Sequence, residues 1–186
     1  MQPKTARVLV IRHGETDWNA QNRVQGSSDI PLNDVGRRQA EEQAQNIKAD
    51  VKTQNAIIFS SPLLRAKETA EIINKQLNLP LLTDSRLCEA NFGELEGLDR
   101  ATLVGGGMMM HYDAMGGEAM AALGVETTES LNARLTSFFT EIKGKYETVI
   151  IVAHGWIARG VKWYFEGREG NETHLPANLE ISEYTL

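Results

Sequence analysis

The sequence predicts an α/β fold with a mostly parallel central sheet, and two observations lead to that expectation. Short runs of β-branched and apolar residues alternate along the chain with longer segments of helical periodicity, an alternation typical of parallel sheets covered by helices. The chain has 186 residues, of which 41% are hydrophobic, enough for one sizeable core but short for two. We therefore expect a single domain over residues 1–186.

Three segments have the composition of buried strands: Val8 to Ile11, Ala56 to Phe59 and Thr148 to Val152. The run "PLLT" near Leu82 and the C-terminal "LEISEYTL" predict two weaker strands. The last of these is expected at an edge of the sheet, where an exposed strand would permit a homodimer.

Four helices are expected between and after these strands. The segment "NDVGRRQAEEQAQNI" has helical periodicity with Asn33 as its N-cap. The segment "SSPLLRAKETAEIINKQL" predicts a helix with Ser61 as N-cap and Pro62 at the first helical position, where the missing N–H is tolerated. A third helix follows Thr128, and a fourth begins just after Gly155. The residues expected to face the core are Val35, Ala40, Ala44 and Ile47, then Leu63, Ala66, Ala70, Ile73 and Leu77, then Leu131, Leu135, Phe138, Phe139 and Ile142.

The irregular segment from Leu98 to Val125 is rich in glycine and methionine. Glycine allows many backbone conformations, and methionine thioethers form an adaptable apolar wall. Long segments of this kind in compact domains are either functional or disordered. Residues 98–125 are therefore interpreted as a lid or specificity insertion over a pocket, with an ordinary surface loop as the open alternative.

Composition limits the classes of partner and the cellular location. The net charge of -6 and pI near 5.3 argue against binding to nucleic acid or an anionic membrane. No apolar run reaches membrane-spanning length, and the first residues lack the features of a signal peptide, so a cytoplasmic location is expected. The single cysteine, Cys88, excludes an internal disulfide and a cysteine-based zinc site; we interpret it as a small apolar filler.

Polar residues follow the carboxyl ends of the predicted strands, where ligands of open α/β folds bind. They are Arg12-His13-Gly14 after the first strand, Ser60-Ser61 and then Arg65 after the second, and His154-Gly155 after the third. Two guanidinium groups and two imidazoles gathered in an acidic protein indicate a site for an oxyanion, most commonly phosphate. The alternative interpretation of the histidines is a metal site, which neighbouring arginines would disfavour by repelling a cation. We expect no metal and no cofactor.

These groups suit chemistry on a phosphomonoester. A neutral imidazole can accept the phosphoryl group, and the arginines, with the second histidine if it is protonated, would stabilise the charge of the transition state. The leaving alkoxide needs a proton donor, for which "RLCEANFGELEG" offers Glu89, Glu94 and Glu96. A carboxyl group buried beside phosphate would have a raised pKa and could act as acid and then as base. The residues alone leave all three glutamates open.

Four segments together resemble a known family. "RHGETDWN", "SSPLLRAKETA", "LCEANFGELEG" and "VAHGWIARGV" are similar to the motif regions of the histidine phosphatase superfamily, also called phosphoglycerate mutase-like. The resemblance extends from Val8 to about Val161, in the order and spacing of the family. It implies a three-layer α/β/α sandwich and an enzyme that needs no metal.

The resemblance also implies roles for individual residues. His13 would be the phosphorylated nucleophile, and Glu89 the acid and base. Arg12, Arg65 and His154 would form a phosphate clamp. Three further positions where family members contact the substrate or its phosphate are Asn19, Gln25 and Gly26.

The family contains mutases and phosphatases, and this sequence departs from the mutase pattern. Cofactor-dependent mutases are similar but longer, with a tyrosine after the acid and two adjacent arginines in the following insertion. Here Phe92 stands in place of the tyrosine, and no arginine occurs between Gly105 and Thr128, which leaves Arg100 as the basic candidate of the region. The expectation is a phosphatase acting on a small-molecule phosphomonoester. The alternatives are a phosphoglycerate mutase and an inactive phosphate-binding module.

Overall fold

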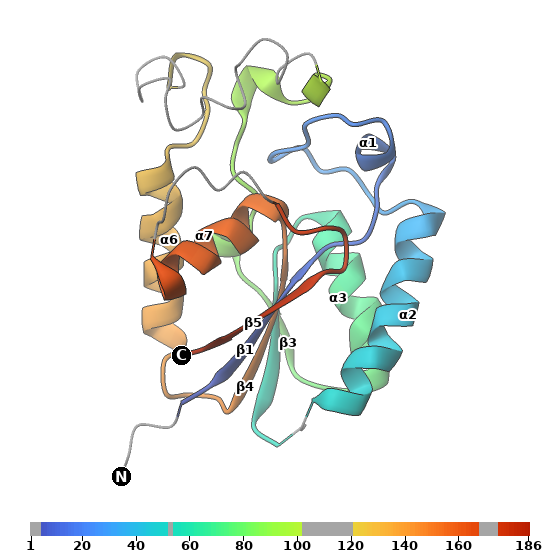
Figure 1. Ribbon diagram of the computed structural model, residues 1–186, viewed down its shortest axis with the longest axis vertical. Helices are drawn as coiled ribbons and strands as arrows, with labels where there is room; N and C mark the ends of the chain where they lie inside the picture. Colours follow the sequence, from blue (N-terminus) through green and yellow to red (C-terminus); the bar gives the residue numbers. More distant parts are fainter. Residues whose placement is uncertain (1–4, 52–53, 102–120, 168–174) are drawn as a thin grey trace.

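The computed structural model describes residues 5–51, 54–101, 121–167 and 175–186, and within them a five-stranded sheet forms the centre of the molecule (Figure 1). Its strands are β1 (Arg7–Arg12), β2 (Ala56–Ser60), β3 (Leu81–Thr83), β4 (Thr148–Ala153) and β5 (Ile181–Thr185). Their order is β3-β2-β4-β1-β5; the first four strands run parallel and β5 pairs with β1 in the antiparallel direction. The three strong strands predicted from the sequence are confirmed to within one residue at each end. The two weaker ones form the edges.

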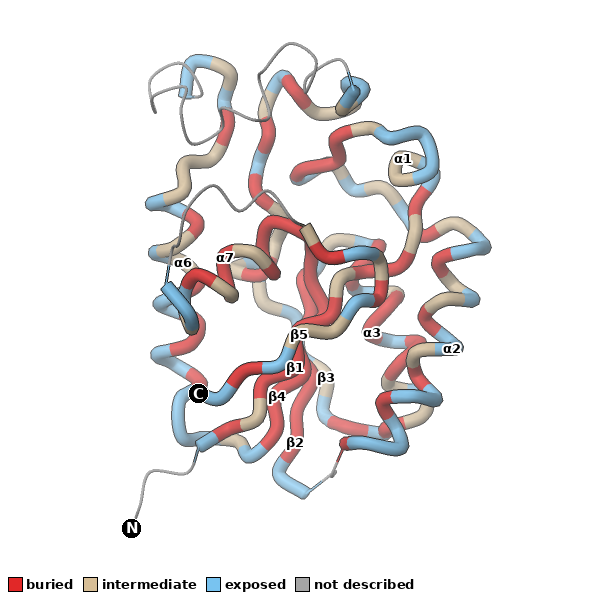
Figure 2. Tube along the Cα trace, viewed as in Figure 1, coloured by how far each residue is buried: buried red, intermediate tan, exposed pale blue. Residues whose placement is uncertain are grey.

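Helices cover both faces of the sheet, which gives the three-layer α/β/α arrangement that the resemblance implies (Figure 1). They are α2 (Asp34–Asp50) and α3 (Leu64–Leu77) on one face, and α6 (Thr128–Ile142) and α7 (Gly155–Glu166) on the other. Successive strand residues point to opposite faces, so Val8 and Val10 belong to the core beneath α6 and α7, and Leu9 and Ile11 to the core beneath α2 and α3. Figure 2 shows the result as nearly continuous burial along the central strands.

The start of α2 follows the prediction except at one residue. The Asn33 side chain caps the helix by accepting a hydrogen bond from the backbone N–H of Gly36 at 2.8 Å. Val35, expected in the core, is exposed, and Gly36 is buried in its place. A Cβ on Gly36 would lie 2.1 Å from the carbonyl oxygen of Glu15. The first turn of α2 therefore packs against the loop that follows β1, at a distance that only glycine allows.

The predicted start of α3 is wrong by two residues. Neither Ser61 nor Pro62 begins the helix: its N-cap is Leu63, which makes no capping bond through its side chain. The backbone N–H of Leu64 donates instead to the carboxylate of Asp29 at 2.7 Å. Because this acceptor comes from a loop far away in the sequence, no local pattern could reveal it. Of the predicted core residues, Leu63 is only partly buried, whereas Ala66, Ala70, Ile73 and Leu77 are buried as expected.

The other elements agree with the sequence where it predicted them. All five predicted core residues of α6 are buried, and α7 begins at Gly155. Three short elements were not anticipated: α1 (Asp17–Ala20) and the 3-10 helices η1 (Ser85–Leu87) and η2 (Gly93–Leu95). Most of the predicted lid, residues 98–125, lies outside the described residues. Among the described helices, none combines the length and the apolar character needed to cross a membrane.

Candidate active site

The two histidines lie one residue beyond neighbouring parallel strands. Arg12, the last residue of β1, is in register with Ala153, the last residue of β4. The backbone N–H of His13 extends this ladder by donating to the carbonyl of Ala153 at 2.9 Å. The rings of His13 and His154 consequently lie with their centroids 5.2 Å apart. Strand register therefore brings the two imidazoles together.

A pocket opens at this end of the sheet and collects most of the predicted site residues. Those that line it are Arg12, His13, Gln25, Gly26, Arg65, Glu89 and Gly155. His154 is fully buried behind His13. Asn19 does not line the pocket: its side-chain oxygen accepts hydrogen bonds from the backbone and hydroxyl of Thr16 in the capping box of α1. The structure thus brings eight of the nine predicted residues to one place, and Asn19 is not among them.

The hydrogen bonding of His13 fixes its tautomer. Its Nδ1 lies 2.7 Å from the carbonyl oxygen of Gly14, which can only accept, so Nδ1 carries the proton and Nε2 keeps a lone pair. Burial lowers the pKa of His13 well below its usual value, and the charges of Arg65 and Arg12 lower it further. The imidazole is therefore neutral at neutral pH and has a nucleophilic nitrogen.

The two arginines of the predicted clamp are fixed by backbone carbonyls. Arg65 is completely buried, and its terminal nitrogens donate to Ser28 and Gly26 at 2.7 Å each. Arg12 donates to the carbonyl of Pro176 at 2.6 Å. Burial lowers the pKa of both guanidinium groups, that of Arg12 to about 10, so both stay positively charged at neutral pH. Neutral carbonyls hold them in position without neutralising them.

Several buried polar atoms around the pocket make no hydrogen bond within the described part of the chain. They are Nε of Arg12, Nε of Arg65, Oε1 of Gln25 and both ring nitrogens of His154. Buried polar groups are normally paired, because desolvating them without a partner costs free energy. Two of these groups are charged N–H donors, so the arrangement fits an oxyanion.

The structure separates the three candidate glutamates. Glu89 lines the pocket, where its carboxylate accepts hydrogen bonds from the backbone N–H of Ala90 and of Trp156 at 3.0 and 3.2 Å. Burial raises the pKa of Glu89, although Arg65 and the two backbone donors oppose the effect. Glu94 is exposed. Of the three, only Glu89 combines access to the pocket with a tendency to hold a proton.

Glu96 instead organises the loop beneath Arg65. Its carboxylate accepts hydrogen bonds from the backbone and hydroxyl groups of both Ser27 and Ser28. Burial raises the pKa of Glu96, but these bonds outweigh it and the net pKa is lowered. Gly26 has a positive φ of 54°, and a Cβ there would lie 2.1 Å from the carboxylate of Glu96. Glu96 thus shapes the loop whose carbonyls hold Arg65.

His154 differs from the expectation in its charge. The sequence suggested that this histidine could stabilise phosphate if it were protonated. Burial lowers its pKa well below the usual value, and Arg65, His13 and Arg12 lower it further. His154 is therefore a neutral imidazole that can donate one hydrogen bond, and the positive charge at the pocket comes from the arginines.

Five further residues line the pocket: Val24, Phe92, Arg100, Trp156 and Leu175. Phe92 and Trp156 make an edge-to-face contact with ring centroids 5.7 Å apart and give the pocket an aromatic wall. Arg100 adds a third guanidinium group. Its isolation in an arginine-poor region was a usable signal, and Trp156 directly follows the predicted Gly155. Val24 and Leu175 have no local signal that distinguishes them from ordinary core residues.

With this geometry established, comparison with known proteins identifies the family. The profile of the histidine phosphatase superfamily, branch 1, matches residues 8–185. The chain belongs to this family, as the four motif segments suggested. The Bacillus subtilis (strain 168) protein named "Uncharacterized phosphatase PhoE" is 40% identical over 150 residues, which cover 80% of this chain and 71% of that protein. The Arabidopsis thaliana protein named "Phosphoglycerate mutase-like protein 4" is 34% identical over 161 residues, 84% of this chain and 69% of the relative.

Solved structures share the fold over nearly the whole chain. A phosphoglycerate mutase from Bacillus anthracis str. Sterne has a TM-score of 0.81 and 25% identity, and the match covers 99% of this chain and 89% of that one. A mycobacterial glucosyl-3-phosphoglycerate phosphatase has a TM-score of 0.75, again at 25% identity, over 96% of this chain and 90% of that one. The fold is thus phosphoglycerate mutase-like, and the family together with its phosphatase-named members supports a phosphohydrolase enzyme.

Proposed function

We propose that the protein is a phosphomonoesterase that hydrolyses a small phosphorylated metabolite through a phosphohistidine on His13. The observation that carries the proposal is the neutral His13 imidazole with its proton held on Nδ1 by Gly14. This nucleophile shares a pocket with a protonatable carboxyl group, Glu89, and with the guanidinium groups of Arg12 and Arg65. Each part needed for phosphoryl transfer is therefore present.

In the first half-reaction, Nε2 of His13 attacks phosphorus. The N–P bond forms as the bond from phosphorus to the ester oxygen breaks, and Glu89 donates its proton to the departing oxygen. Negative charge spreads over the three equatorial phosphoryl oxygens in the transition state. The N–H groups of Arg12 and Arg65, held in place before the reaction, stabilise that charge without reorganisation.

In the second half-reaction, water replaces the alcohol. The Glu89 carboxylate takes a proton from water, whose oxygen forms a bond to phosphorus as the N–P bond breaks. Inorganic phosphate leaves, and His13 and Glu89 return to their starting protonation states. Burial favours the protonated carboxyl group, so Glu89 can act as acid in the first step and as base in the second.

The lining of the pocket supports a substrate with one phosphate and a partly apolar leaving group. Arg12 and Arg65 suit the phosphate, and the edge-to-face pair of Phe92 and Trp156 offers an apolar surface to the alcohol portion. The phosphatase names of relatives agree with hydrolysis, whereas other relatives are named phosphoglycerate mutases. A transfer assay with 3-phosphoglycerate and its bisphosphate primer decides between them: we expect release of inorganic phosphate from substrates and no 2-phosphoglycerate.

The nucleophile is tested by comparing the parent protein with His13→Ala on p-nitrophenyl phosphate. We expect loss of at least about a thousandfold in kcat, since removing a covalent nucleophile abolishes its pathway. Rapid quenching at alkaline pH, where a phosphoramidate survives, followed by mass spectrometry should place phosphate on the peptide that contains His13. Equal rates for the two proteins would refute the assignment, and phosphate binding without turnover in the parent would indicate a binding module.

A further inference from the structure

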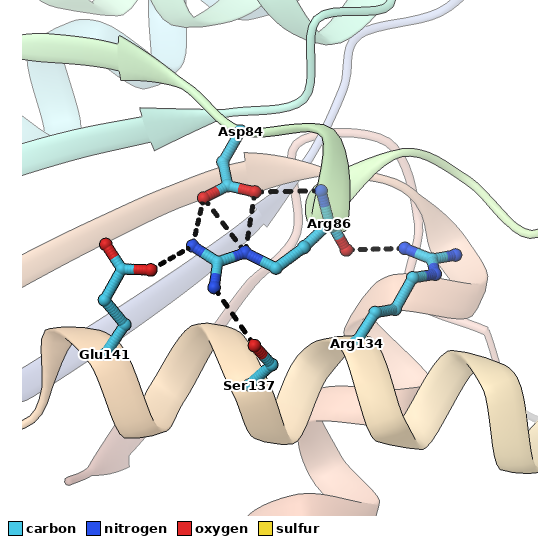
Figure 3. A network of polar contacts seen from close by, with 5 residues as sticks. All are labelled: Asp84, Arg86, Arg134, Ser137 and Glu141. Atoms are coloured by element: carbon cyan, nitrogen blue, oxygen red, sulfur yellow. Dashed lines mark hydrogen bonds and ion pairs between the residues drawn. The ribbon is translucent and has the colours of Figure 1, made fainter.

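The backbone segment that carries Glu89 is held by helix α6. Residues 84–88 lead from the end of β3 to Glu89, and α6 lies alongside them (Figure 3). Arg86 contacts this helix through Glu141 at 2.8 Å and Ser137 at 3.3 Å, and it also binds Asp84 within the segment. These contacts attach the segment to α6 at its beginning. They do not reach the residues next to Glu89.

Arg134 of α6 makes the contacts nearest to Glu89. One terminal nitrogen of its guanidinium group donates to the carbonyls of both Arg86 and Cys88, at 2.5 and 2.7 Å. Cys88 is the residue directly before Glu89. The other side of the guanidinium group forms a bidentate pair with the carboxylate of Glu126, at 2.8 and 2.9 Å. All three nitrogens of this planar group thus donate hydrogen bonds.

Glu126 extends the same arrangement to the other side of Glu89. Its backbone N–H donates to the carbonyl of Asn91 at 2.7 Å, two residues after the glutamate. The side chains of Arg134 and Glu126 are partly buried, with 18% and 16% of their surface exposed. A partly buried bidentate pair with further hydrogen bonds resists rearrangement more than an exposed ion pair does.

We propose that Arg134 is a positioning residue for proton transfer: its guanidinium group, together with Glu126, fixes the backbone on both sides of Glu89 and so holds the carboxyl group at the pocket. This inference rests on the proposed function, in which Glu89 is the acid and base. Proton transfer depends steeply on the distance between donor and acceptor. Freeing the Cys88 carbonyl would let the Glu89 backbone shift, with no direct contact between Arg134 and the substrate.

The proposed positioning depends on the planar shape of the Arg134 guanidinium group, and this shape can be tested separately from its charge. The charge of Arg134 also acts on His154 through space, so a lysine variant separates the two effects. Lysine keeps the charge, but its compact ammonium group cannot reproduce a planar fork that spans two carbonyls and a carboxylate. Positioning by geometry predicts that Arg134→Lys behaves like Arg134→Met. An effect of charge alone predicts that it behaves like the parent.

The test compares kcat/KM for p-nitrophenyl phosphate, whose leaving group needs little protonation, with that for phenyl phosphate, whose leaving group needs more. Arg134→Met and Arg134→Lys should each lose about tenfold more on phenyl phosphate than on p-nitrophenyl phosphate. Glu126→Gln should shift the ratio in the same direction by a smaller factor. The matched control is Glu141→Ala, which removes another contact between α6 and the same segment and should leave both rates unchanged.

A purely structural role of Arg134 would reduce both rates by the same factor, and that result would overturn the inference. A ratio of the two kcat/KM values in Arg134→Lys equal to that of the parent protein would also overturn it. Should Arg134→Met fail to fold, Arg134→Lys and Glu126→Gln still give the ratio. Measuring Glu89→Gln alongside separates a failure of the proposed function of Glu89 from a failure of the proposed role of Arg134. Equal loss on both substrates in Glu89→Gln refutes the acid itself. A preferential loss there, without one in Arg134→Lys, refutes only the role of Arg134.

Discussion

Burial of the site shifts the pKa values of His13 and Glu89 in opposite directions. In the proposed mechanism, burial at His13 removes the proton that would block the attacking nitrogen, because an imidazolium in a dehydrated site beside two arginines is unfavourable. At Glu89 it favours retention of the proton that the leaving group needs. One physical cause therefore favours the neutral form of both partners of the proposed first half-reaction.

The first prediction concerns the pH dependence of kcat/KM. Activity should rise with pH as His13 loses its proton, at a pH below the usual histidine value, and should fall at higher pH as Glu89 loses its own, above the usual carboxyl value. Glu89→Gln should keep the acidic limb and abolish the alkaline one, because glutamine does not titrate. The measurement is a pH profile with phenyl phosphate, with Glu94→Gln as the control because Glu94 is exposed on the same segment. An alkaline limb that survives in Glu89→Gln would assign it to another group.

At the scale of elements, the loop after β1 is fixed by close contact with the first turn of α2. A Cβ at Gly14 would lie 2.6 Å from the carbonyl oxygen of Gly36, and one at Gly36 would lie 2.1 Å from that of Glu15. The backbone N–H of Gly14 also donates to the hydroxyl of Thr69 in α3 at 3.1 Å. Gly14, the residue after His13, is thus held between two helices.

The second prediction follows from this contact. Gly36→Ala should lower the free energy of unfolding by about 1–3 kcal/mol, because its methyl group displaces the backbone at Glu15. It should also reduce turnover, since the displacement reaches His13. Val35→Ala is the control: the neighbouring side chain is exposed, and its truncation should change stability by less than about 0.5 kcal/mol. Urea denaturation of both variants measures the difference, and equal stabilities would contradict the proposed close contact.

Local patterns predicted the parts of this site that are determined by neighbours in the sequence. Each of the three strong strands could be recognised from its apolar residues. The polar residues that follow these strands were therefore expected at their carboxyl ends, on the same side of the sheet. The start of α3 was missed because its first N–H is satisfied by Asp29. The hydrogen bond from Arg134 to the carbonyl of Cys88 was missed for the same reason. Such contacts join segments that are far apart in the sequence. A backbone carbonyl can be supplied by any residue, so its role as acceptor cannot be recognised from the residue type.

At the scale of the whole molecule, an acidic chain encloses a cationic pocket. The net charge is -6, whereas the residues that line the pocket include three arginines and one carboxyl group, Glu89. Both buried histidines have strongly lowered pKa values. The folded state therefore resists protonation at His13 and His154, although the unfolded chain accepts protons there.

The third prediction is that these histidines make the fold sensitive to acid. Above about pH 6.5 they are neutral in both states and contribute no pH dependence. Below that, the unfolded state binds more protons, so stability falls as pH falls. Glu89, with its raised pKa, acts in the opposite direction, and a difference measurement therefore isolates one histidine. In urea denaturation between about pH 7 and pH 5, His154→Asn should reduce the slope by up to about 1.4 kcal/mol per pH unit. An unchanged slope would show that His154 titrates normally.

The antiparallel pairing of β5 with β1 bears on how the enzyme matures during synthesis. β1 is synthesised before the other strands of the sheet but lies between β4 and β5, the two that come after all the others in the sequence. The carbonyls of Arg12 and His13 are bound by the backbone of Leu179 and the side chain of Asn178. A nascent chain would thus carry His13 long before the contacts that orient it could form, and chains that end before β4 should hydrolyse no phosphomonoester.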